Sequence, residues 1–192
     1  MTFKKNTTGK TVFLTFDDGP TPVVTDWLLQ FLENENIPAT FFWVGEKINK
    51  NKELARKVVN AGHTIGNHTY HHLDAWKTGT NLYIEEIKKT EKHINGLYNS
   101  KKLFRPPYGH LSPKKIKILK QMEFKVVMWT VVSGDFYPKL NTDKVIKKLS
   151  RQTKPGYILV FHDSRKAFKN LKSILPPVVH NLKSRGFTFE ML

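Results

Sequence analysis

The stretch TVFLTFDDGP at positions 11–20 decides the fold. Its first six residues are apolar or β-branched, which predicts a strand buried on both faces, as in a parallel sheet. Two carboxylates, Asp17 and Asp18, follow this strand directly, and Gly19-Pro20 then forces a turn. In parallel α/β folds the ligand site lies at the carboxyl ends of the strands. The stretch therefore predicts both a core strand and a polar site at its end.

Similar apolar runs recur along the chain and alternate with segments of helical periodicity. The predicted strands cover 11–16, 39–44, 125–132 and 157–162, and the predicted helices cover 21–35, 51–61, 83–97, 113–122, 142–150 and 167–184. This alternation predicts an α/β architecture with parallel strands. Neither an internal repeat nor a Pro/Gly/Ser linker interrupts it, so we expect residues 1–192 to form a single domain, with a flexible N-terminal segment at 1–9.

The chain contains no cysteine, which excludes disulfides, thiolate metal sites and cysteine nucleophiles. Any bound metal must therefore use His, Asp or Glu. No apolar run approaches the roughly 20 residues needed to span a bilayer, and the opening MTFKKNTTGK has no signal-peptide stretch. We expect no membrane span. The compartment stays open between the cytoplasm and, if an export signal was removed, the periplasm or the exterior.

The charge is strongly positive, because 32 Lys and Arg face 16 Asp and Glu for a formal net charge of +16. Such a charge attracts polyanions, among them nucleic acid, anionic cell-wall polymers and acidic lipid head groups. The basic residues are dispersed, however, without interleaved aromatic residues that would form a stacking platform for bases. We interpret them as a solvated surface and expect no specific nucleic-acid partner. The oligomeric state is left open.

A second polar cluster is GNHTYHH at 66–72. Imidazoles four residues apart lie on one face of a helical turn and can reach one metal ion, and His68 and His72 have this spacing. A His pair alone is as often found on a surface or in a core. Together with a carboxylate such as Asp18, two His ligands leave coordination positions open for water and substrate, as a catalytic metal site requires.

Two further groups of polar residues follow apolar stretches. The segment FRPPYG at 104–109 is too rich in proline for a helix, and it offers the guanidinium of Arg105 and backbone N–H groups that can stabilise an oxyanion. Asp135 and His162 each lie near the carboxyl end of a predicted strand. A His in this place can protonate a leaving amine, and a neighbouring acid such as Asp135 can raise its pKa.

In their order and spacing these motifs resemble carbohydrate esterase family 4, the NodB-type polysaccharide deacetylases, over about residues 10–190. TFDDGP is unbroken at 15–20, and the H-T-x-x-H pattern is formed by His68, Thr69 and His72. The resemblance implies a distorted (β/α) barrel with about seven parallel strands. It also implies an acetylated glycan as substrate and the hydrolysis of N-acetyl groups on a peptidoglycan-like or chitin-like polymer of N-acetylglucosamine.

The resemblance implies a role for each site residue. Asp17 would be the general base on the attacking water, and Arg105 would orient its carboxylate. Asp18, His68 and His72 would bind one divalent metal ion, for which we expect zinc, with cobalt, nickel and manganese also suited to two imidazoles and a carboxylate.

Three more roles follow from the same resemblance. The backbone N–H of Tyr108 would stabilise the tetrahedral oxyanion. His162 would be the general acid, and Asp135 would tune its pKa. Asp163, next along the chain, is either an orienting residue for the site or a helix cap.

Three positions depart from the family pattern and concern the choice of substrate. Val132 and Phe136 stand where the fourth motif usually has Asp and Trp, so the apolar wall keeps a smaller ring. Val160 replaces a Leu of the fifth motif and slightly enlarges the pocket expected for the acetyl methyl group. Two alternatives therefore stay open: an O-acetyl esterase of the acetylxylan type, and a sugar-binding protein without turnover.

Several aromatic residues are candidates for a sugar-binding groove, because aromatic faces stack on pyranose rings. They are Trp43, Trp76 and Tyr70, and core packing is an equal alternative for Trp43. His110 belongs to no motif, and we expect no functional role for it. His71 is expected to point away from the metal ligands.

Overall fold

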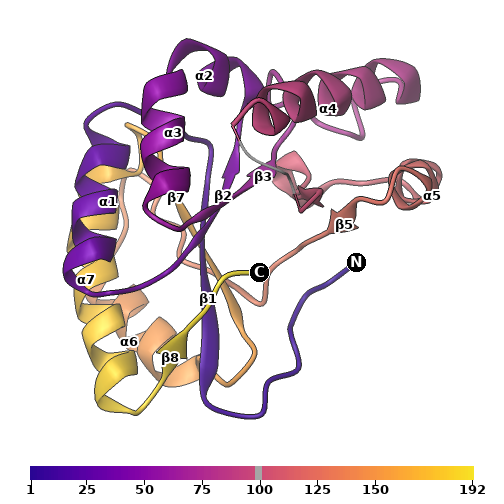
Figure 1. The fold of residues 1–192 in the computed structure, drawn as a ribbon. Helices are drawn as coiled ribbons and strands as arrows, with labels where there is room; N and C mark the ends of the chain where they lie inside the picture. Colours follow the sequence, from indigo (N-terminus) through magenta and orange to yellow (C-terminus); the bar gives the residue numbers. More distant parts are fainter. Residues whose placement is uncertain (98–100) are drawn as a thin grey trace.

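The computed structural model describes residues 1–97 and 101–192 (Figure 1). The strands are β1 (Thr11–Asp17), β2 (Thr40–Trp43), β3 (Thr64–Asn67), β4 (Leu103–Phe104), β5 (Lys125–Val126), β6 (Val131–Val132), β7 (Ile158–His162) and β8 (Thr188–Phe189). The helices are α1 (Val24–Asn34), α2 (Gly45–Lys50), α3 (Lys52–Asn60), α4 (Thr80–Asn95), α5 (Pro113–Gln121), α6 (Thr142–Gln152) and α7 (Phe168–Ser184), with a 3-10 turn at Pro107–Gly109.

The strands form one curled sheet, an open half-barrel with the order β5-β4-β3-β2-β1-β7-β6. Neighbouring strands pair in parallel, and β8 adds a short parallel pairing with the first residues of β1. This confirms the predicted α/β fold of about seven parallel strands in a single domain. Because the strands are parallel, their carboxyl ends meet at one edge of the sheet.

Strand β1 lies inside the sheet, and all seven of its residues are buried. It pairs with β2 on one side and β7 on the other, so Asp17 stands opposite Phe42 and His162 in the register. The stretch at 11–17 therefore forms the core strand that its sequence predicts. Its last residue lies where two neighbouring strands also end.

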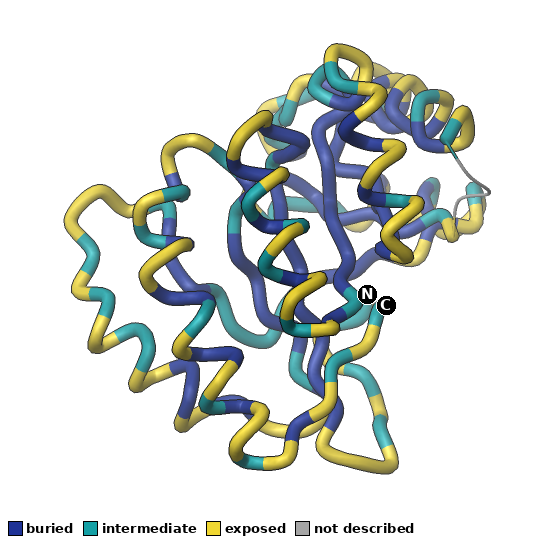
Figure 2. Tube along the Cα trace, turned by 60° about the vertical axis from the view of Figure 1, so that its left-hand side comes forward, coloured by how far each residue is buried: buried dark blue, intermediate teal, exposed yellow. Residues whose placement is uncertain are grey.

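Helices cover the outside of the sheet and turn an apolar stripe toward it. In α1 the buried residues Val24, Leu28 and Leu32 recur every four positions, the spacing of one helix face. Helix α7 packs beside β7, and α4 and α5 lie beside β3 and β5 on the other side of the molecule (Figure 1). Figure 2 shows the buried strands inside and the exposed outer faces of the helices around them.

The prediction of one continuous strand at 125–132 is wrong. β5 and β6 lie at the two opposite edges of the sheet, and the chain between them crosses the open side of the half-barrel. Thr2 intervenes there, since its N–H donates to Val126 O at 2.8 Å and its carbonyl accepts from Met128 N–H at 2.7 Å. An unbroken apolar run carries no mark of such a change of pairing partner, which explains the error.

The N-terminal segment 1–9 lies along the sheet, where Lys5 N–H donates to Gly156 O at 2.9 Å. Its flexibility stays a prediction. Among the described residues, no helix combines the length and apolar character that crossing a bilayer would require.

Candidate active site

The Asp17 carboxylate is buried at the end of β1 and paired with Arg105. Arg105 Nη1 lies 2.7 Å from Asp17 Oδ1 and donates also to Thr15 Oγ1. The other guanidinium nitrogens donate to the carbonyls of Met128 and Val127. Arg105 is fully buried, so these contacts replace water around its charge. They hold the Asp17 carboxylate in one orientation at the carboxyl end of β1.

Position 19 tolerates only glycine, because a Cβ there would run into Asp163 Oδ2 and Trp43 Nε1. The turn after the two carboxylates therefore packs tightly against the ends of β2 and β7. Lys47 Nζ donates to Asp18 O at 2.7 Å from the other side. These contacts fix the position of the Asp18 backbone.

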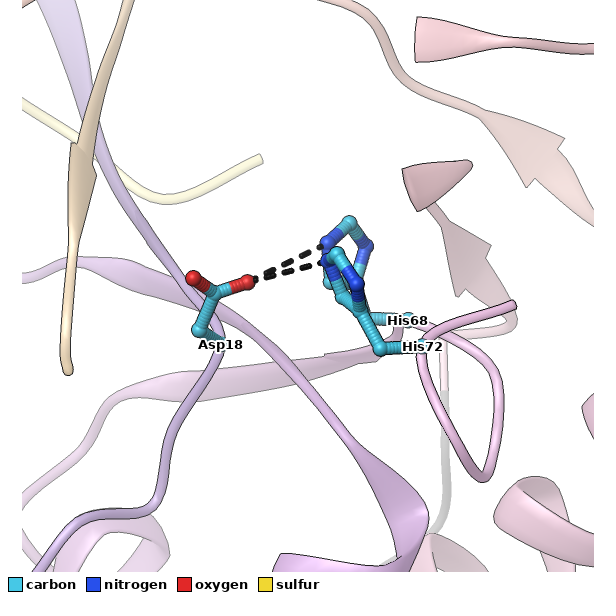
Figure 3. Close-up of side chains that lie close together, drawn as sticks. All are labelled: Asp18, His68 and His72. Carbon is cyan, nitrogen blue, oxygen red and sulfur yellow. Dashed lines mark ion pairs between the residues drawn. The ribbon is translucent and has the colours of Figure 1, made fainter. Parts of the chain in front are cut away.

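Asp18, His68 and His72 come together as a cluster suited to one metal ion (Figure 3). Asp18 Oδ1 lies 3.2 Å from His72 Nε2 and 3.7 Å from His68 Nε2. One ligand atom from each residue falls within 4.8 Å of the others. The structure thus brings together the three residues that the sequence analysis assigned to the metal.

The two histidines do not lie on a helical turn, so that part of the prediction is wrong. They sit in a loop after β3, where Thr69 and His72 have positive φ angles of 63° and 57°. The side chain of Asn67 supports the loop by accepting from Thr69 N–H at 3.0 Å and donating to Ile87 O. The loop brings the two imidazole rings to a centroid distance of 5.0 Å by a different route.

The protonation of this cluster suits a divalent ion. His68 Nδ1 lies 2.6 Å from the carbonyl of Arg105, which can only accept, so the proton sits on Nδ1 and leaves Nε2 free as a ligand. Burial lowers the pKa of His68 to about 4, which keeps its ring neutral. For Asp18, burial acts to raise the pKa, but the hydrogen bond from His72 and the nearby His68 outweigh it and lower the pKa. Imidazole nitrogens and a carboxylate are the ligands that zinc and related ions use.

His162 and Asp135 form a second ion pair at the same edge. His162 Nδ1 lies 2.7 Å from Asp135 Oδ1, and its backbone N–H donates to Asp135 Oδ2 at 2.9 Å. Burial acts to lower the pKa of His162, yet the hydrogen bond and charge of Asp135 outweigh burial and raise it. The carboxylate thus holds the Nδ1 proton and leaves Nε2 for chemistry.

The Tyr108 backbone lies in the left-handed region, with φ 60° and ψ 2°. Within the described part of the chain, its N–H has no acceptor, whereas Gly109 and His110 donate to Pro106 and Pro107. The Tyr108 ring is 61% exposed and contacts His72 edge-on at 4.9 Å. The loop therefore carries one backbone donor without an acceptor, on the residue whose ring contacts His72.

These groups line one pocket of about 530 Å³. Its walls are formed by Asp17, Asp18, His68, His72, Pro106, Tyr108, His110, Trp129, Val132, Phe136, Val160, His162, Ser164 and Lys166. Every predicted site residue takes part except Arg105 and Asp135, which lie behind Asp17 and His162. The pocket therefore brings together the Asp17 carboxylate, the His162 imidazole and the cluster of Asp18, His68 and His72.

Comparison with known proteins places the chain in a family. The family described as polysaccharide deacetylase matches residues 4–127. The chain belongs to the polysaccharide deacetylase family. This confirms the resemblance noted in the sequence. A peptidoglycan-N-acetylglucosamine deacetylase of Bacillus cereus is 32% identical over 183 residues, which cover 94% of this chain and 66% of the relative. The chain thus spans slightly less than two thirds of that relative.

Solved polysaccharide deacetylases have the same fold. A peptidoglycan N-acetylglucosamine deacetylase superimposes with a TM-score of 0.94 at 30% identity, covering 100% of this chain and 90% of the other. A family 4 carbohydrate esterase from Streptomyces lividans, in complex with acetate, has a TM-score of 0.85 at 31% identity, covering 95% and 92%. These likenesses include the segments of Asp135 and His162, which lie beyond the residues matched by the family model.

In this polysaccharide deacetylase domain, the buried Asp163 connects the segments that surround the pocket. Its carboxylate accepts from Thr25 Oγ1 at 2.8 Å and from Trp43 Nε1 at 3.1 Å, and its backbone N–H donates to Asp17 O. Burial raises its pKa to about 7. Of the two readings of Asp163, the contacts favour the orienting one. Trp43 is fully buried and belongs to the core.

Sequence reasoning missed four pocket residues: His110, Trp129, Ser164 and Lys166. Trp129 and Ser164 lie at the outer ends of the fourth and fifth motif segments, and none of the four residues was assigned a chemical role there. His110 follows the RPPYG segment directly, and that position was the one available signal. His71, as expected, points elsewhere and pairs with Glu86 at 2.9 Å.

Proposed function

We propose that this polysaccharide deacetylase hydrolyses N-acetyl groups on a peptidoglycan-like polymer of N-acetylglucosamine and depends on one divalent metal ion. The observation that carries the proposal is the convergence of Asp17, the Asp18 cluster and His162 on one pocket. The names of the relatives, peptidoglycan deacetylases, support the choice of polymer.

A divalent ion bound by Asp18, His68 and His72 would supply a Lewis acid for the acetyl carbonyl and the attacking water. We propose zinc, and cobalt, nickel and manganese suit the same ligands. Asp17 accepts the proton of the water as it attacks the acetyl carbon. Arg105 holds the Asp17 carboxylate in one orientation toward the pocket through the 2.7 Å contact.

The negative charge that develops on the acetyl oxygen needs donors in place before the reaction. The N–H of Tyr108 suits this role, because it has no acceptor among the described residues and belongs to the residue whose ring contacts His72. Loss of a single such donor costs about 100-fold to 1000-fold in kcat. Phe136 and Val160 form an apolar wall for the acetyl methyl group.

The last step breaks the bond between the acetyl carbon and nitrogen. His162 Nε2 donates its proton to the departing nitrogen, and acetate and a free amine leave. An amide nitrogen must be protonated before this bond breaks, so a His whose pKa is raised by Asp135 fits an amide substrate especially well. The alcohol oxygen of an O-acetyl ester can leave with less protonation. The same site therefore supports hydrolysis of such an ester as the second candidate.

The test measures acetate release by zinc-loaded protein from N-acetylglucosamine oligomers and from acetylated xylan, with and without a chelator. We expect release from the N-acetylated oligomers that stops on chelation. Faster release from xylan would favour the esterase, and bound oligomers with no release from either would favour the sugar-binding alternative.

Neighbouring histidines provide a matched pair of variants. His72→Ala removes one proposed metal ligand and should lower both metal affinity and acetate release by about 100-fold, the upper end of the loss that follows removal of a ligand's supporting partner. His71→Ala removes an adjacent imidazole that pairs with Glu86 and should keep both. Equal losses in the two variants would contradict the assignment of His72.

A further inference from the structure

Three rings form a row that leads outward from the metal ligands. Tyr108 contacts His72, and His110 follows with its ring centroid 6.0 Å from that of Tyr108. Trp76 then stacks on His110 at 3.6 Å with an interplanar angle of 8°. Tyr108 and His110 also line the catalytic pocket. The row is therefore continuous with the site where the acetyl group is removed.

Trp76 is unusually open for its size. It is 68% exposed although His110 covers one face of its indole, so the opposite face is turned to solvent. Scattered single apolar residues on a surface need no explanation. Here, however, the exposed indole and the exposed Tyr108 ring flank the same half-buried imidazole at the mouth of a pocket.

The stack is held rigid by one carboxylate. Asp74 Oδ1 accepts from the backbone N–H of Trp76 at 2.9 Å and lies 2.9 Å from His110 Nδ1. The loop that carries Trp76 is thereby tied to the loop that carries His110. A rigid, preformed surface loses less conformational entropy when a ligand binds.

A buried lysine holds the same loop through two hydrogen bonds. Lys115 at the start of α5 is 5% exposed, and its Nζ donates to Ala75 O at 2.9 Å and to Thr78 O at 3.0 Å. Burying an ammonium group without hydrogen bonds is costly, so these carbonyls and the lysine hold one another in place. The loop that carries the exposed Trp76 is thus held in place both by Asp74 and by Lys115.

We propose that Trp76, backed by His110, is a platform on which one pyranose ring of the glycan chain stacks, away from the sugar that loses its acetyl group. This inference rests on the proposed function and names a second sugar of the polymer that the protein binds. A pyranose ring has an apolar face of C–H groups, which matches an open indole, and a rim of hydroxyls that stays in water. A sugar fits this place better than a nucleobase, because the platform continues from a pocket built for a sugar's acetyl group.

The first test compares substrates of different length in Trp76→Ala and wild-type protein, both loaded with zinc. We expect the ratio of kcat/KM for an N-acetylglucosamine pentamer to that for the dimer to fall about tenfold, the size of one lost stacking contact. Trp76→Phe keeps an aromatic face and should recover most of the ratio. Phe3→Ala, which removes another exposed ring at the N-terminus, should leave both rates and the ratio unchanged.

The second test measures binding without turnover. Zinc-loaded Asp17→Asn protein, with and without Trp76→Ala, is titrated with the same oligomers, and the affinity for the pentamer should fall about tenfold while that for the dimer falls less. Lys115→Met leaves the indole intact but frees its loop, and it should weaken pentamer binding as well. Thermal unfolding of each variant separates these effects from misfolding.

The two proposals fail separately. If wild-type protein released no acetate from any oligomer but still bound the pentamer through Trp76, the platform would stand and the proposed function would not. If Trp76→Ala lowered the rates for dimer and pentamer equally, or left pentamer affinity unchanged, the platform would be refuted while deacetylation stood. Trp76-dependent binding of an oligonucleotide in preference to the pentamer would also overturn it.

Discussion

The pair of Asp135 and His162 sets the proton supply of the proposed reaction. The carboxylate holds the imidazole through Nδ1 at 2.7 Å and is itself fully buried. Since Asp135 raises the pKa of His162, it extends the pH range over which this imidazole carries a proton toward the alkaline side.

Asp135→Asn keeps the shape of the side chain and removes its charge. The pKa of His162 should fall, so that the ring loses its proton at lower pH. We expect the alkaline limb of the profile of kcat against pH to move to lower pH, while zinc content stays the same. An alkaline limb that does not move would assign it to another group.

Arg105 and Asp17 form a buried ion pair whose two halves depend on each other. Arg105→Met removes the guanidinium and leaves the Asp17 carboxylate buried without its partner, which should cost about 3–5 kcal/mol in the free energy of unfolding. Urea unfolding measures this loss.

The double variant decides whether the unpaired charge causes the loss. Arg105→Met with Asp17→Asn removes both charges, and it should be more stable than Arg105→Met alone. If the two substitutions instead added their separate costs, the pair would be uncoupled and this account of Arg105 would be wrong.

The sequence was informative about residues wherever a motif carried the chemistry. Asp17, Asp18 and His162 all line the pocket as expected, because each follows directly from a predicted strand end. The stack of Trp76 on His110 could not be predicted. The ring of Trp76 made it a candidate for sugar binding, but its pairing with His110 depends on two loops, 34 positions apart, that meet only after folding.

At the scale of elements, Asp163 ties three segments together. It follows β7, accepts from Thr25 in α1 and from Trp43 at the end of β2, and donates to the last residue of β1. The loop that carries Asp17 and Asp18 is therefore held between these elements.

The raised pKa of Asp163 makes this junction sensitive to pH. Between its ordinary pKa of 3.8 and its folded pKa of about 7, the folded state binds more protons than the unfolded state. Its contribution to stability is therefore present below about pH 4 and is lost as the pH rises through about 7.

Asp163→Asn cannot ionise and should lack this dependence. We expect the unfolding free energy of the variant, relative to wild type, to increase from about pH 4 to about pH 8. Urea titrations of both proteins across this range give the difference directly. A difference that stays constant would show that Asp163 does not titrate in this window. Other groups, such as His63 with its pKa lowered to about 4, cancel because both proteins carry them.

Long, strongly patterned elements were predictable and short ones were not. β1, β7 and α7 appear close to their predicted bounds, since each shows a clear period or an unbroken apolar run. The two-residue strands β4 and β8 are too short to show any period. Their pairing is decided by neighbours distant in sequence, as is the division of the run at 125–132 into two strands.

At the scale of the whole molecule, the proposed metal ligands connect parts of the sheet that do not pair directly. Asp18 follows β1, and His68 and His72 follow β3, with β2 lying between them. A ligand that binds only the folded arrangement stabilises it by mass action.

Zinc should therefore raise the stability of the whole domain. At a free concentration of about 100 times Kd, we expect a gain of about 2.7 kcal/mol, or roughly 5–10 °C in Tm. Calorimetry with and without chelator measures the gain, and His72→Ala should abolish most of it. An equal rise in Tm for His72→Ala would place the stabilising ion elsewhere.

One contact of His68 has a bearing on how such a protein varies over generations. The group that decides which of its nitrogens is protonated is the main-chain carbonyl of residue 105, not a side chain. Every amino acid carries that oxygen, so no substitution at this position deletes it. Substitutions can change the side chain that position 105 offers to Asp17. The proposed coordinating nitrogen of His68 is kept as long as the backbone keeps its course, because the backbone carbonyl fixes the tautomer.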